Sequence, residues 1–60
     1  MKVKVLKNAI KVTHISNESQ LEMVDAVADA AGSEYEQADF GTTVIVTTNL
    51  DAFVQEWNGQ

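Results

Sequence analysis

Seven consecutive β-branched residues at positions 42–48 (TTVIVTT) restrict the fold of this chain more than any other feature. Side chains branched at Cβ are stiff at χ1 and suit the pleated surface of a sheet. The run therefore predicts a central strand, around which the other elements must be arranged.

The N-terminal residues predict two more strands. Residues 2–15 alternate apolar with polar side chains, first at Val3 and Val5 and then at Ile10 and Val12, which is the period of a half-buried strand. Lys7 and Asn8 lie between the two segments, and asparagine tolerates the left-handed backbone of a tight turn. We expect a β-hairpin.

A helix from about Glu18 to Ala31 is the clearest prediction. Asn17 and Gln20 have the spacing of a capping box, and Gly32 stands where a helix C-terminus favours glycine. At about 100° per residue, the apolar side chains fall on one broad side of this helix. The opposite side carries four carboxylates at 4-3-4 spacing, which we name the acidic stripe: Glu18, Glu22, Asp25 and Asp29.

The remaining residues predict one weaker strand and a short helix. Acidic residues and two aromatic rings between Gly32 and Gly41 favour a strand at about 36–40 over an irregular loop. Asn49 is a good N-cap for a two-turn helix that ends near Gly59. Its apolar positions recur at i, i+3, i+4 and i+7: Leu50, Phe53, Val54 and Trp57.

The expected fold class is α+β, in the order β-β-α-β-β-α. An antiparallel sheet of three or four strands would carry the long and the short helix, and residues 1–60 would form a single small domain. A chain of 60 residues buries only about 60% of its unfolded surface, and it has no cysteine for a disulfide. We therefore expect support from a homodimer. The N-terminus has no signal-peptide core, so we expect a cytoplasmic protein.

Charge is segregated along the chain. All four lysines lie within the first eleven residues, all nine acidic residues lie between Glu18 and Glu56, and the net charge is -5. A charged outer face is typical of any amphipathic helix, so a solvated stripe is the plainer interpretation. However, no lysine of the helix balances the stripe, and solubility does not require a face of one sign. The functional interpretation is an acidic face that binds a basic surface on a partner protein.

The lysines allow a different function. Lys2, Lys4, Lys7 and Lys11 could contact phosphates, since β-ribbons enter DNA grooves in some small dimeric proteins. Lysines on an exposed strand also block edge-to-edge aggregation. The chain has no arginine, and its negative charge opposes approach to a polyanion, so nucleic-acid binding is the alternative hypothesis.

Catalysis and cofactor binding have little support in the sequence. His14 is the single histidine, with no nucleophile and base arranged around it, and no zinc ligand set is present. The three glycines are isolated, so they form no phosphate-binding loop. The acidic residues do not have the spacing of a calcium-binding EF-hand. We expect a protein that is not an enzyme and holds no metal or cofactor.

Leu50, Phe53 and Trp57 have two interpretations. They pack in the core, or they form part of an interface, because tryptophan is enriched among binding hot spots and so small a core seldom encloses every large ring. The sequence as a whole predicts a non-enzymatic protein-interaction module, acting as an acidic regulator or inhibitor. The alternative is a dimeric nucleic-acid-binding protein.

Overall fold

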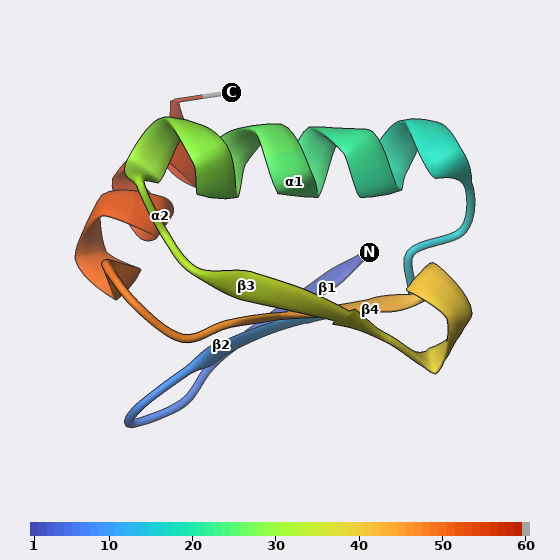
Figure 1. The fold of residues 1–60 in the computed structure, drawn as a ribbon, viewed down its shortest axis with the longest axis horizontal. Helices are drawn as coiled ribbons and strands as arrows, with labels where there is room; N and C mark the ends of the chain where they lie inside the picture. The colour runs from blue at the N-terminus through green and yellow to red at the C-terminus, as the bar shows by residue number, and fades with distance from the viewer. Residues whose placement is uncertain (60) are drawn as a thin grey trace.

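The computed structural model describes residues 1–59 and contains one sheet and two helices (Figure 1). The elements in chain order are β1 (Lys2–Val5), β2 (Ile10–Thr13), α1 (Glu18–Ala31), β3 (Tyr35–Ala38), a 3₁₀ turn (Asp39–Gly41), β4 (Thr43–Val46) and α2 (Leu50–Asn58). This order confirms the predicted α+β fold, β-β-α-β-β-α.

All strand pairs of the sheet are antiparallel, in the spatial order β1-β2-β4-β3. The β-branched run supplies β4, which is central as predicted, and β1 and β3 form the two edges. Val3 faces Val12, which in turn faces Val44, and Ile10 faces Val46. Partners across a ladder share one face of the sheet, so these valines and Ile10 belong to the same side.

Both helices lie on that side of the sheet (Figure 1). The core between the helices and the sheet consists of Ile10, Val12, Ile15, Val24, Val27, Ala28, Val44, Val46 and Phe53. It is nearly all aliphatic, and Phe53 from α2 is its largest side chain. Neither helix covers the other face of the sheet, whose middle row runs from Lys4 through Lys11 and Ile45 to Glu36.

Local hydrogen bonds explain where α1 begins and ends. Asn17 Oδ1 accepts a hydrogen bond from the backbone N–H of Gln20 at 2.9 Å, as the capping-box spacing predicts. Gly32 has φ 68°, and its N–H donates to the Asp29 carbonyl, while Ser33 N–H donates to the Ala28 carbonyl. This is the pairing of a Schellman motif, which requires a left-handed residue after the helix. The predicted bounds of α1 are confirmed.

The prediction of a strand at 36–40 is wrong in its bounds. The strand β3 covers Tyr35–Ala38, and Asp39 and Phe40 follow it with φ values of 51° and 57°. A left-handed backbone cannot continue a strand, so the ladder stops before these two residues. Phe40 therefore anchors nothing within the sheet, and its side chain is fully exposed.

The role predicted for Asn49 also requires correction. Asn49 does precede α2, but it has φ 51° and its side chain caps no helical N–H. Instead, its Nδ2 donates to the Gly32 carbonyl at 2.7 Å, and the Ser33 hydroxyl donates to the Asn49 carbonyl at 3.3 Å. Asn49 thus joins the start of α2 to the end of α1, an interaction distant in sequence that a local motif does not reveal.

Candidate functional site

The acidic stripe lies along the flank of α1 that faces β3. Asp29 Oδ1 accepts a hydrogen bond from the Tyr35 hydroxyl at 3.1 Å, and Asp25 Oδ2 accepts one from Gln37 Nε2 at 2.8 Å. Both donors belong to β3 and sit on the helix side of the sheet. The C-terminal half of the stripe is therefore joined to the β3 edge.

The four stripe residues differ in exposure. Glu18, Glu22 and Asp29 are exposed, whereas Asp25 is half-buried. The second carboxylate oxygen of Asp25 is buried and accepts no hydrogen bond from residues 1–59. A carboxylate can accept several hydrogen bonds, so Asp25 is held in one orientation by Gln37 while part of its acceptor capacity is unused.

Tyr35 is held as a hydrogen-bond donor by its surroundings. Partial burial, the hydrogen bond to Asp29 and the negative charges of Asp25 and Asp29 together raise the pKa of Tyr35 above the value of about 10 usual for tyrosine. The phenol therefore keeps its proton, and can donate to Asp29, up to a higher pH than an isolated tyrosine would.

The β3 side of the molecule gathers most of the negative charge. Seven of the nine acidic residues belong to α1, to β3 or to the segments that border β3, and the other two, Asp51 and Glu56, belong to α2. We name the surface formed by the acidic stripe and β3 the acidic edge. Besides the stripe, it includes Glu36 of β3, which belongs to the uncovered face of the sheet, and the two acidic residues that border β3, Glu34 and Asp39.

The lysines gather on the opposite side. Lys2 and Lys4 are on the edge strand β1, Lys11 is on β2 beside Lys4, and all three belong to the face of the sheet that the helices leave uncovered. Lys7 lies in the hairpin turn. Two strands, β2 and β4, separate β1 from β3. The charge division of the sequence is thus also a division in space.

The predicted apolar positions of α2 separate into buried and accessible residues. Phe53 is fully buried and stacks on Trp57, with ring centroids 5.8 Å apart and an angle of 21° between the planes. Leu50 and Trp57 are half-buried. Trp57 also lines a groove of about 250 Å³ between α2 and β1. Leu50 and Trp57 both pack against the core and remain partly accessible, and of the two Trp57 lines the groove.

Phe40 is a candidate contact residue that the sequence interpretation missed. Its side chain is fully exposed, and two consecutive left-handed non-glycine residues, Asp39 and Phe40, present it at the tip of the turn after β3. Backbone strain of this kind is concentrated at functional sites, and exposed aromatic rings are frequent binding anchors. The available signal was the adjacent Gly41, which marks a turn rather than a strand end.

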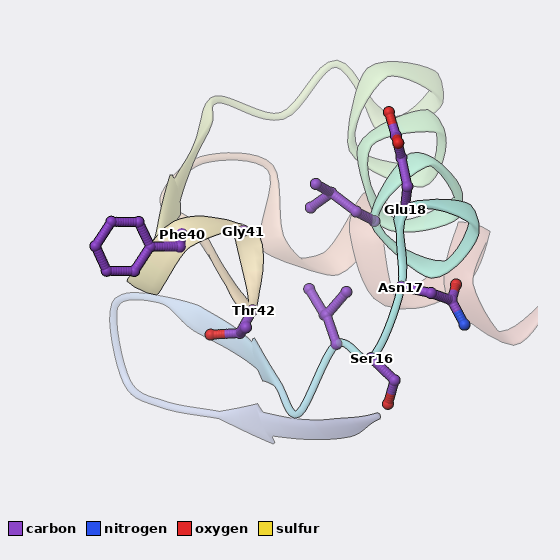
Figure 2. A pocket seen from close by; sticks show the side chains of 8 residues that line it. Ser16, Asn17, Glu18, Phe40, Gly41 and Thr42 are labelled. Carbon is purple, nitrogen blue, oxygen red and sulfur yellow. The ribbon is translucent and has the colours of Figure 1, made fainter.

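A shallow depression separates Phe40 from the start of α1. It measures about 310 Å³ and is lined by Ile15, Ser16, Asn17, Glu18, Leu21, Phe40, Gly41 and Thr42. Figure 2 shows the ring of Phe40 pointing away from this depression, so that it is presented to solvent. None of the lining residues is a histidine or a cysteine, and the depression offers no nucleophile paired with a base.

His14 and the acidic residues form no metal centre in the described part of the chain. The Nδ1 atom of His14 lies 3.0 Å from the Thr13 hydroxyl, on an exposed loop. No group of three or more histidine and carboxylate side chains within residues 1–59 is placed to hold a metal ion. Within the same residues, no helix is long and apolar enough to cross a lipid bilayer.

The fold and the surface define a small α+β domain with two oppositely charged sheet edges. No protein-family model matches the chain, and no curated protein or solved structure matches it.

Proposed function

We propose that this protein is a non-enzymatic protein-interaction module whose acidic edge binds a basic surface on a partner protein, as an acidic regulator or inhibitor does. The observation that carries the proposal is the spatial separation of charge, because the lysines belong to β1, β2 and the turn between them, whereas the acidic edge carries only acidic residues. Complementary potentials steer association and select among partners.

The exposed residues of the stripe are the ones available to a partner. Within residues 1–59, Glu18 and Glu22 are exposed and accept no hydrogen bond from β3, whereas Asp25 and Asp29 already accept hydrogen bonds from it. Ion pairs at an exposed rim contribute modestly to affinity, so a stable complex also needs an apolar anchor. Phe40 is the candidate anchor, since its ring is fully exposed on the turn that follows β3.

Affinity purification from the host cells tests the acidic edge. We expect the wild-type chain to recover basic proteins, and the double substitution Glu18→Lys and Glu22→Lys to lose them, because both side chains are exposed and no contact of theirs within the fold is broken. Asp51→Lys on α2 is the control, since it reverses an exposed carboxylate that belongs neither to the acidic stripe nor to β3. Recovery of the same proteins by the double variant would contradict electrostatic binding at this surface.

Phe40→Ala distinguishes the contribution of the Phe40 ring to partner binding from the contribution of the acidic residues. We expect this variant to fold normally and to weaken partner recovery, while the salt dependence of the remaining binding stays the same, because no charge is removed. Unchanged recovery would remove Phe40 from the interface and leave the acidic edge acting alone.

Dimerisation and a cytoplasmic location belong to the same proposal. The chain is small and has no cysteine for a disulfide, so a second copy would add the buried surface that so small a core lacks. Light scattering coupled to size exclusion measures the mass in solution. A monomer at micromolar concentration that still unfolds cooperatively would contradict the homodimer.

The uncovered sheet face favours one alternative function, nucleic-acid binding. Lys2, Lys4 and Lys11 share that face, with Lys7 at the hairpin tip, and this arrangement could follow a phosphate backbone. Binding to duplex DNA at physiological salt that disappears when the four lysines are changed to alanine would support it. Absence of binding under those conditions leaves the protein-interaction proposal.

A further inference from the structure

The edge strand β1 leaves backbone hydrogen-bonding groups without a strand partner. Leu6 N–H donates to the Ala9 carbonyl at 2.8 Å and so points toward β2. Along an antiparallel strand, residues alternate between pointing their N–H and C=O groups inward and outward. The groups of Val5 and Val3 therefore point outward, which is the arrangement that accepts an added strand.

The helix side of β1 is an open apolar surface. Val3 and Val5 face the same side as the fully buried Ile10 and Val12, yet they are 37% and 64% exposed. Beside them runs the groove of about 250 Å³, whose opposite wall is formed by α2. The helix contributes Phe53, Val54, Trp57 and Asn58 to this wall.

The other side of β1 is cationic. Lys2 and Lys4 alternate with the two valines and project from the uncovered face, and Lys11 lies directly across from Lys4. A strand added next to β1 would alternate in the same way. One set of its side chains would enter the apolar groove, and the other set would lie beside Lys2 and Lys4.

We propose that the β1 edge binds an extended segment of a partner protein in which apolar and acidic residues alternate. The apolar residues fill the groove against Val5 and Trp57, the acidic residues pair with Lys2 and Lys4, and the backbone continues the sheet. This site is separate from the acidic edge, because β1 and β3 lie at opposite edges of the sheet.

The lysines disfavour a second copy of β1 as the occupant. Antiparallel pairing of two β1 strands with Val3 opposite Val5 places Lys4 opposite Lys4, and pairing with Val3 opposite Val3 places Lys2 opposite Lys4. Like charges directly opposite each other destabilise a strand pair. An acidic segment removes this repulsion and also neutralises the existing pair of Lys4 and Lys11.

A heptapeptide of alternating valine and glutamate, blocked at both ends, is the probe for this site. Trp57 is the single tryptophan and lines the groove, so binding should shift its fluorescence to shorter wavelength in a saturable way. The amides of Val3 and Val5 should become protected from hydrogen exchange, because they would then donate to the peptide. No saturable shift up to millimolar peptide would overturn the proposal.

Charge exchange at Lys4 gives the decisive comparison. We expect Lys4→Glu to weaken binding of the valine–glutamate peptide by about tenfold and to create binding of a valine–lysine peptide. Lys7→Glu changes the charge by the same amount in the hairpin turn, away from the added strand, and should weaken binding by less than about threefold. Equal effects of the two substitutions would mean attraction at long range only, and would overturn the proposed site.

Val5→Pro tests the backbone contact. Proline removes the outward N–H of Val5 without removing a bond to β2, and edge strands tolerate proline in that position. We expect loss of peptide binding with the amide spectrum of β4 unchanged. If instead the amides of Val3 and Val5 become protected as protein concentration rises without peptide, a second copy occupies the edge and the acidic segment is the wrong partner.

Discussion

The two edges of the sheet are protected from unwanted pairing in different ways. On β3, side chains of the strand are bonded to α1, through Tyr35 to Asp29 and through Gln37 to Asp25. On β1 no helix covers the apolar side chains, and Val5 is 64% exposed. On this strand, the lysines that alternate with the valines disfavour pairing with the edge strand of another molecule.

The difference indicates how each edge can be used. The β3 edge is a folded, hydrogen-bonded surface, so a partner meets side chains that are already oriented. The β1 edge has free backbone groups next to an open groove, so it can accept a strand. We propose that charge then selects the partner at each edge, with a basic surface for β3 and an acidic segment for β1.

The largest loss of stability is expected from Phe53. It is one of two phenylalanines that lie near opposite edges of the sheet, and the other, Phe40, should contribute little. Phe53 is fully buried behind the groove of β1, and Phe53→Ala should reduce the free energy of unfolding by about 3–5 kcal/mol. Phe40 lies at the end of β3 with its ring in solvent, so Phe40→Ala should change it by less than about 0.5 kcal/mol. Urea unfolding followed by circular dichroism measures both values.

A domain of this length has a total stability of only about 3–9 kcal/mol, so Phe53→Ala should leave much of the chain unfolded. The milder change Phe53→Leu keeps the comparison measurable. A similar loss for Phe40→Ala would show that its ring is buried in solution, against another copy of the chain or elsewhere.

The order of elements could be predicted because its signals are local. Alternation over 2–5 and 10–13 gives strands, and the Asn17 and Gly32 signals set the bounds of α1. The bounds of β3 could not be predicted, because the left-handed backbone of Asp39 and Phe40 is permitted but not required by those residue types. The same limit hid the exposure of Phe40, since an aromatic residue near a strand usually indicates core.

The surfaces were less predictable because they depend on strand order. Spacing alone places Glu18, Glu22, Asp25 and Asp29 in one stripe, but only the packing of α1 over β3 brings Asp29 to Tyr35. The lysines could be assigned to a hairpin, yet it is the order β1-β2-β4-β3 that makes β1 an edge. These are contacts between segments distant in sequence, which local periodicity does not specify.

The turn that follows β3 should be sensitive to a single methyl group. Gly41 has φ 86°, and a Cβ at this position would lie 3.2 Å from Leu21 Cδ2. The left-handed region disfavours alanine, so Gly41→Ala should reduce the free energy of unfolding by about 1–2 kcal/mol. Gly59, with φ -83°, is the control, and Gly59→Ala should be nearly neutral. Equal effects would show that the turn adopts another backbone conformation.

A smaller effect should come from the bond between Tyr35 and the stripe. Tyr35→Phe removes the donor to Asp29 at an exposed site, so we expect a loss of stability below that of Gly41→Ala. The folded state raises the pKa of Tyr35, so this contribution is complete below about pH 10 and is lost as the pH rises through the folded pKa.

Tyr35 is the only tyrosine, so phenolate absorbance reports its titration directly. The difference in stability between wild type and Tyr35→Phe should therefore shrink above pH 10. All other ionisable groups, including the lysines, are common to both proteins, so their effects on stability cancel in this difference. A difference that grows with pH would contradict the contact between α1 and β3.

The smallest effect should come from relieving the repulsion on β1. Lys4 lies directly opposite Lys11, so Lys4→Glu should raise the free energy of unfolding by a few tenths of a kcal/mol, whereas Lys7→Glu in the turn should leave it unchanged. The gain should fall as salt is added, because salt screens exposed charges. A loss of stability for Lys4→Glu would mean that Lys4 is paired with an acidic group in solution. In that case the lysines of β1 would be neutralised within the assembly, and the contrast between the two edges would be one of packing rather than of charge.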